Sequence, residues 1–217
     1  MKLSKRTQAI LKNFAGINQS IVINPGSQLQ TISNVKDLYA KATIEESFET
    51  KVAIYDVNEF LGVLSLFEDP DLEFSDNSVV IKQGKMKQTY YYADSSVITT
   101  PPENGVNLPS TEVTAKFTRE QLQSIIKAAS LNDSQALTFS NGNAKVWNAN
   151  VANSNSFEIE GIADHNADYG LSIPVDKLKM VADDYTVELC AKGLSRFVGT
   201  QDIEYVAALM PNGYYNG

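Results

Sequence analysis

The chain has 217 residues, a net charge of −8 and 43% hydrophobic residues, enough for one sizeable core or two of about 100 residues each. It contains no run of about 18 apolar residues, and its start, MKLSKRTQAILKNF, lacks a signal-type apolar stretch. We therefore expect neither membrane insertion nor secretion, and we expect a cytoplasmic protein. The single cysteine, Cys190, lies in the alternating run YTVELC, which predicts a buried strand residue.

The first predicted element is a basic amphipathic helix within residues 3–18. Ser4 is placed to cap its start, and Lys5 and Lys12 fall opposite its apolar stripe. Residues 1–18 contain four cations and no acid, whereas a surface helix usually mixes signs to gain ion pairs. The pattern favours a cationic binding face over a merely solvated one. The residues of the apolar stripe are Leu3, Thr7, Ile10, Leu11 and Phe14.

Short strand-like runs and one further helix follow in the first half. SIVI, QLQTIS, LYAKATI and FETKVAIY are predicted strands separated by turn signals. DVNEFLGVLSLF, residues 56–67, is a predicted helix with Asp56 as N-cap, and the strands DLEF, SVVIKQ and QTYYYA follow it. Residues 45–76 hold ten acids against Lys51 alone, so charge is segregated along the chain.

The first helix recurs in altered form at residues 117–132, FTREQLQSIIKAASLN. Thr118 takes the capping position, Lys127 lies opposite the apolar stripe and Arg119 flanks it. Glu120 also faces outward, so this copy is less purely basic. Its predicted apolar stripe consists of Leu122, Ile125, Ile126 and Ala129.

The second half then repeats the order of the first. ALTF, AKVWNA, FEIEGI and YGLSI are predicted strands, PVDKLKMVA (174–182) a predicted second helix, and YTVELC, SRFVGT and IEYVAAL the last strands. Residues 95–113 are rich in Pro, Gly, Ser and Thr, which is typical of a connector. We therefore predict an α+β chain of two similar domains, residues 1–108 and 109–217, about an approximate symmetry axis.

Three strings carry a resemblance to a known family: MKLSKRTQAILKNFAGIN, VAIYDVNEFLGVLSL and the late YVAAL. They resemble the DNA polymerase sliding clamps of T4-like bacteriophages, over essentially the whole length. The resemblance implies a DNA clamp fold in a homotrimeric ring, with helices lining a central hole and antiparallel sheets outside. It also implies a ring that encircles duplex DNA without reading its sequence, is loaded by an ATP-dependent clamp loader, tethers the replicative polymerase and supports late transcription.

The DNA-facing residues that the resemblance implies are cations on the repeated helices. Helix 56–66 offers no cation, only Asn58, Gly62 and Ser65 opposite its apolar stripe. The two lysines of helix 174–182 fit solvated surface as well as they fit DNA contact. The candidate DNA-binding residues are Lys2, Lys5, Arg6, Lys12, Arg119, Lys127, Lys177 and Lys179.

The family also has a hydrophobic site where short C-terminal peptides of polymerase and other partners dock. Residues near the connector and the C-terminus are candidates for its lining, with ordinary packing as the open alternative. The candidate partner-binding residues are Val97, Ile98, Val106, Leu108, Met210 and Pro211.

Catalytic signatures are weak in this sequence. It has no G-x-x-x-x-G-K-[ST] or G-x-G-x-x-G motif, and we expect no enzyme activity, cofactor or metal. His165 lies beside Asp164 and Asp168, where a polar loop is a better interpretation than a metal site. The rival hypotheses are a structural β-rich phage protein that does not bind DNA, and an enzyme that uses the acidic loops.

Overall fold

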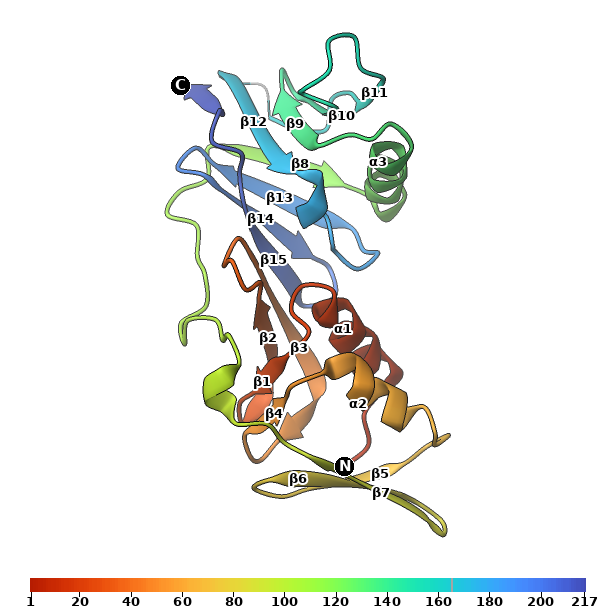
Figure 1. The fold of residues 1–217 in the computed structure, drawn as a ribbon. Helices are drawn as coiled ribbons and strands as arrows, with labels where there is room; N and C mark the ends of the chain where they lie inside the picture. Colours follow the sequence, from red (N-terminus) through yellow and green to blue (C-terminus); the bar gives the residue numbers. More distant parts are fainter. Residues whose placement is uncertain (165) are drawn as a thin grey trace. The chain divides into compact units, whose positions relative to one another are not determined.

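The computed structural model describes residues 1–164 and 166–217 of the chain. It consists of two compact α+β units, Met1–Gly105 and Val106–Gly217 (Figure 1). None of the helices in the described residues has the length and apolar character that crossing a membrane requires. Each unit has its own core.

The first unit contains two α-helices, three small groups of strands and one 3-10 turn. β1 pairs with β4, β2 with β3, and β5, β6 and β7 form a three-stranded sheet, all antiparallel. The elements are α1 (Lys5–Ala15), β1 (Ile21–Ile23), β2 (Gly26–Ile32), β3 (Leu38–Phe48), β4 (Val52–Ile54), α2 (Val57–Leu64), β5 (Asp71–Phe74), β6 (Ser78–Gln83), β7 (Met86–Tyr91) and η1 (Ser95–Val97).

The core of this unit forms where α1 packs against α2 and β3 (Figure 1). Ser4 caps α1 by accepting a hydrogen bond from the Thr7 amide at 3.1 Å, and Asp56 caps α2 through the Glu59 amide at 3.0 Å, so both predicted caps are confirmed. The predicted apolar stripe of α1 is also confirmed. Its buried members are Leu3, Thr7, Ile10, Leu11 and Phe14.

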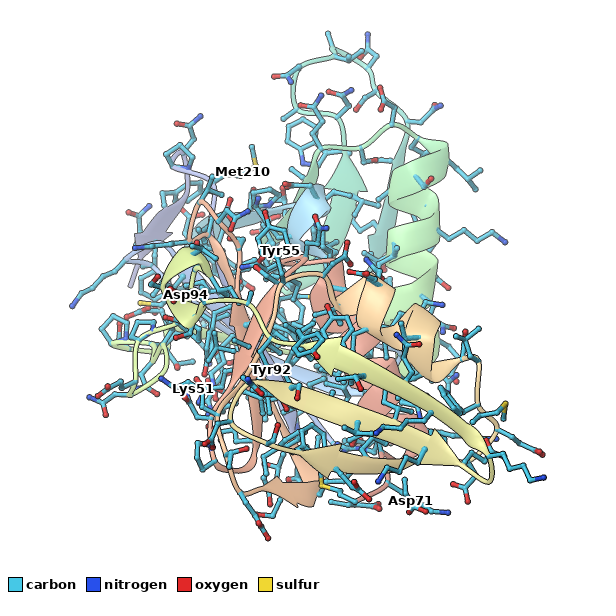
Figure 2. The ribbon with its side chains drawn as sticks, turned by 60° about the horizontal axis from the view of Figure 1, so that its bottom comes forward. Lys51, Tyr55, Asp71, Tyr92, Asp94 and Met210 are labelled. Carbon is cyan, nitrogen blue, oxygen red and sulfur yellow. The ribbon has the colours of Figure 1, made fainter. Side chains whose placement is uncertain are left out.

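The three-stranded sheet has one covered edge and one open edge. At the β5 edge, Met1 and Leu72 exchange two backbone hydrogen bonds, of 2.7 and 2.9 Å. The other edge is β7, the last strand in the order β5-β6-β7. Figure 2 brings this sheet forward, with Asp71 at the start of β5 and Tyr92 just after the end of β7.

The second unit has one α-helix and two antiparallel sheets. One sheet has the order β11-β10-β9-β12-β16, and in the other β8, β13, β14 and β15 pair in that order. α3 packs against β8, β10 and β11. The elements are β8 (Val113–Phe117), α3 (Arg119–Leu131), β9 (Ala136–Ser140), β10 (Asn143–Trp147), β11 (Ser156–Ile159), β12 (Asp168–Pro174), η2 (Val175–Lys177), β13 (Tyr185–Cys190), β14 (Leu194–Gly199), β15 (Ile203–Ala208) and β16 (Tyr214–Asn216).

The predicted helix at 174–182 is wrong, because only the 3-10 turn η2 forms there. Pro174 still belongs to β12, and the Val175 amide donates to the Gln135 carbonyl at 3.0 Å. Four residues beyond η2, the amide and carbonyl of Val181 bond the hydroxyls of Tyr205 and Tyr185. The backbone groups that a helix would need are therefore committed to strands and tyrosines.

Other differences from the predictions are local. Ala128 is buried in α3 while Ile126 stays partly exposed, and β3 runs four residues past the predicted end at Ile44. β8 starts at the last residue of the predicted connector, and β16 was not predicted. Cys190 is buried in β13 with no exposed surface, as predicted.

Candidate nucleic-acid interface

The solvent face of α1 carries two exposed lysines and no acid. Lys5 and Lys12 are seven residues apart, so they lie on one face with a rise of about 10.5 Å between them. Neither side chain forms a hydrogen bond or ion pair with any other residue that the structure describes. Two long cationic side chains on one helix face can attract the phosphates of DNA. Because both side chains are flexible, they do not hold a phosphate in one fixed position.

The other two cations of the N-terminal segment are held by the protein itself. Arg6 donates from Nη1 to the Thr43 carbonyl at 2.8 Å and is only partly exposed. Lys2 precedes the helix and pairs with Asp69, and this hydrogen bond raises the pKa of Lys2. Their positive charge is therefore less available to a phosphate than that of the two exposed lysines.

α3 carries the corresponding cations of the second unit. Arg119 and Lys127 are both exposed, and neither the guanidinium of Arg119 nor the ammonium of Lys127 forms a hydrogen bond or ion pair within the described residues. The helix starts with a capping box in which Thr118 and Gln121 bond each other's backbone amides. Glu120 is exposed in the first turn, so this face is cationic but mixed.

The remaining predicted positions contribute less. Asn58, Gly62 and Ser65 are exposed on or at the end of α2, as the sequence predicts, and supply no charge. Lys177 pairs with Asp176 at 2.8 Å, and its side chain is only 17% exposed. Because no helix forms at 174–182, Lys177 and Lys179 do not share a helical face, which corrects that part of the predicted arrangement.

Carboxylates from distant segments sit at the first turns of α1 and α3. Glu46 accepts hydrogen bonds from the Ser4 amide and, at 2.5 Å, from the Thr7 hydroxyl. Burial would raise the pKa of Glu46, but these hydrogen bonds outweigh it and the pKa is lowered. At α3, Asp184 accepts from the Arg119 amide at 2.6 Å.

Sequence reasoning missed both of these carboxylates. A capping box joins residues three apart and is visible as a local motif, whereas Glu46 and Asp184 lie 42 and 65 residues from their donors. A partial signal was available in α1. Its N3 position is Thr7 rather than Glu or Gln, so the amide of the cap residue must find its acceptor elsewhere.

The candidate partner-binding residues are distributed over both units. In the first unit Val97 is 64% exposed, while Ile98 is 6% exposed and belongs to the core. The others lie in the second unit: Val106, Leu108 and Met210 are partly exposed and Pro211 is exposed. The Met210 amide is bonded to the Ser172 carbonyl at 2.8 Å, which fixes the backbone after β15.

The loop with the lone histidine shows ordinary polar contacts where it is described. His165 lies outside the described residues. Asp164 accepts from the Thr114 amide at 3.0 Å, and Asp168 accepts from Asn216 at 3.2 Å. Across residues 1–164 and 166–217, no group of three His, Cys, Asp or Glu side chains is arranged to hold a metal ion.

Comparison with known sequences covers both units. Residues 2–100 match the family model of the DNA polymerase processivity factor, and residues 113–210 match that of the gp45 sliding clamp, C terminal. The sliding clamp of Vibrio phage KVP40 is 38% identical, with 96% of this chain and 98% of the relative covered. The sliding clamp of Enterobacteria phage T4 is 31% identical, with 96% of each chain covered.

Solved structures show the same fold at low sequence identity. The A. fulgidus PCNA, solved with the C-terminal region of FEN-1, gives a TM-score of 0.70 at 14% identity, with 94% of each chain covered. The H. pylori beta clamp gives a TM-score of 0.69 at 16% identity; the match covers 99% of this chain but 64% of that one. The α+β clamp fold that the sequence predicts is confirmed.

Proposed function

This chain belongs to the sliding clamp family of phage DNA polymerase processivity factors, and we propose that three copies close into a ring around duplex DNA. Such a ring tethers the replicative polymerase by topology and has no need to read bases. Contacts to phosphate position a protein on DNA without sequence information, which suits a tether that must slide. The protein would act in the host cytoplasm, where the phage replicates.

The exposed face of α1 is the observation that carries this proposal. A chain with a net charge of −8 places two unpaired lysines on one acid-free helix, and Arg119 and Lys127 on the corresponding helix of the second unit. Overall negative charge repels DNA, so cations gathered on these faces direct the duplex to them. We assign DNA contact first to Lys5 and Lys12 and then to Arg119 and Lys127.

Ring closure needs two complementary edges on each copy. Within the described residues, β7 pairs only with β6 and β11 pairs only with β10, so each strand has an open edge. Lys87 is exposed on β7 and Lys85 just before it, and Glu158 is exposed on β11 and Glu160 just after it. We propose that β7 of one copy pairs with β11 of the next, because backbone groups and charges then match.

The partners follow from this role. An ATP-dependent clamp loader would open and place the ring, the polymerase would dock through a hydrophobic peptide, and late transcription proteins would use the same clamp. The clamp itself is proposed to be non-catalytic. Val97 stays a candidate for peptide contact in the first unit, and Val106, Leu108, Met210 and Pro211 stay candidates in the second, whereas Ile98 is buried.

The direct test loads the protein onto nicked circular DNA with its cognate loader and ATP, and then linearises half of the sample. A topological ring stays on the circle and leaves through the free ends of the linear DNA. Gel filtration of the protein–DNA mixtures measures retention. Equal retention on both forms would refute a ring, and no retention on either form would favour the alternative of a structural protein that does not bind DNA.

A further inference from the structure

The last residues of the chain form the edge strand of the five-stranded sheet. Residues 211–217 lie beyond both stretches that match the family models, and within them β16 pairs antiparallel with β12, at the end marked C in Figure 1. Without β16, the edge of this sheet would be β12 itself. The register pairs are Tyr214 with Gly170, Tyr215 with Tyr169 and Asn216 with Asp168.

Two features of β12 hold this segment in place. A Cβ at Gly170 would lie 2.7 Å from Cε1 of Tyr214, so the tyrosine ring rests against a position that has no side chain. The Asp168 carboxylate accepts a hydrogen bond from the Tyr214 hydroxyl at 3.3 Å and another from Asn216 Nδ2 at 3.2 Å. Backbone pairing, ring contact and side-chain hydrogen bonds therefore act together on a strand of only three residues.

An uncovered β12 would be a favourable edge for pairing with another strand. It is seven residues long, Asp168–Pro174, and Asp168 is its only charged residue. Proteins usually protect such an edge with charged side chains, with a very short strand or with a covering segment. β16 meets two of these conditions, because it covers β12 and, with three residues, offers little edge of its own.

We propose that β16 keeps the β12 edge of one copy from pairing with the β12 edge of another copy. Pairing of the same edge on two copies is an isologous contact, which joins them about a two-fold axis. In the proposed ring β7 and β11 are already paired, so an uncovered β12 would be a further edge through which one ring binds another. The inference rests on the proposed function for the ring, and the role of β16 is tested separately from it.

The test removes residues 212–217 and measures mass by sedimentation velocity. We expect the wild type to sediment as one ring and the shortened chain to form heavier species, because two β12 edges can then pair. A shortened chain that sediments like the wild type would overturn the inference. Circular dichroism checks that it folds. Should it fail to fold, Tyr214→Pro in the full chain removes a backbone donor from β16 and must then produce the heavier species.

A lysine on β12 separates strand pairing from general aggregation. In the shortened chain, Gly170→Lys brings like charges together in any contact between two β12 edges, and it should restore the wild-type mass. Heavier species that persist in this variant would show that another surface joins the copies, and would overturn the inference.

Ser140→Lys in the shortened chain is the matched control. Ser140 is partly exposed and pairs with Gly170 from β9, one strand further from the edge. It adds the same charge to the same sheet, so the heavier species should remain. Equal restoration by both lysines would mean that net charge, and not the β12 edge, controls the association.

The outcomes distinguish this inference from the proposed function. A wild type that sediments as a single copy and is not retained on circular DNA refutes the ring. A shortened chain that is heavier than the wild type, and that Gly170→Lys alone returns to the wild-type mass, supports the role of β16 in either case.

Discussion

A cationic side chain is available to DNA only when no neighbouring group of the protein binds it. Lys2, Lys5, Arg6 and Lys12 look alike in the sequence, yet Asp69 holds the first and the Thr43 carbonyl holds the third. Asp69 lies 67 residues from Lys2 along the chain, and Thr43 lies 37 residues from Arg6. The sequence therefore predicted a basic segment correctly, and only the folded structure separates the two free lysines from the two held cations.

Two glycines give opposite predictions for the same substitution. At Gly199 an added Cβ would lie 2.7 Å from Asp183 Oδ2 and 2.8 Å from Ile203 Cγ2, so Gly199→Ala should destabilise the protein by about 1–3 kcal/mol. Gly62 lies inside α2, and apart from its chain neighbours and the nearby backbone of the same helix no heavy atom lies within 4 Å of that Cβ, so Gly62→Ala should stabilise by about 0.5–1 kcal/mol. Urea unfolding measures both, and shifts of the same sign would contradict the predicted packing.

The carboxylate of Glu46 should make stability depend on pH. Its pKa lies below the ordinary 4.5, because hydrogen bonds from Thr7 and Ser4 outweigh the effect of burial. A lowered pKa in the folded state adds stability above about pH 4.5, and that stability is lost as the pH falls through the folded value.

Glu46→Gln should therefore lower the free energy of unfolding at pH 7 by about 1 kcal/mol, the low end for a charged hydrogen bond because the side chain is partly exposed. The difference from the wild type should shrink as the pH falls below 4.5. Urea unfolding at pH 7, 5 and 3 gives the comparison. A difference that stays constant over this range would show that the carboxylate charge contributes nothing to α1.

At the scale of elements, the predictions succeeded where the cause is local. Apolar periodicity and hydroxyl or carboxylate caps identified α1, α2 and α3, and alternation located most strands. The helix expected at 174–182 failed because distant groups decide that segment, the Gln135 carbonyl and the hydroxyls of Tyr185 and Tyr205. The carboxylates at the helix starts escaped prediction for the same reason.

The cationic face of α1 gives the main prediction about DNA. Lys5→Glu with Lys12→Glu should leave the fold unchanged, since both side chains are exposed and unpaired among the described residues. DNA-dependent stimulation of the polymerase should fall. The slope of log affinity against log salt should flatten by about 0.9 for each phosphate that the variant no longer neutralises.

The matched control reverses two exposed lysines of the same unit that lie in turns before β3 and β4 rather than on α1, Lys36→Glu with Lys51→Glu. Its net charge equals that of the α1 variant, so any effect of overall repulsion is the same in both. We expect the control to keep a salt slope near that of the wild type. Equal reductions in the two variants would mean that net charge, and no particular face, governs the interaction with DNA.

At the scale of the whole molecule, the distribution of charge fits an assembly of several copies better than a single chain. The acid-free helix α1 belongs to a chain whose net charge is −8, and the open edges of β7 and β11 carry exposed charges of opposite sign. Unpaired edges usually invite aggregation. A basic edge on one unit and an acidic edge on the other instead favour a closed, head-to-tail assembly of identical copies.

A charge exchange across these edges tests the assembly. Lys87→Glu alone should place acids opposite Glu158, and Glu158→Lys alone should place cations opposite Lys87; each should weaken every interface of the ring by about 0.5–1 kcal/mol. The chain with both substitutions restores opposite charges and should regain the wild-type mass in sedimentation velocity. High salt should reduce all these differences, because exposed charges are screened. A double variant that dissociates as much as the two single effects combined would mean that β7 and β11 do not face each other.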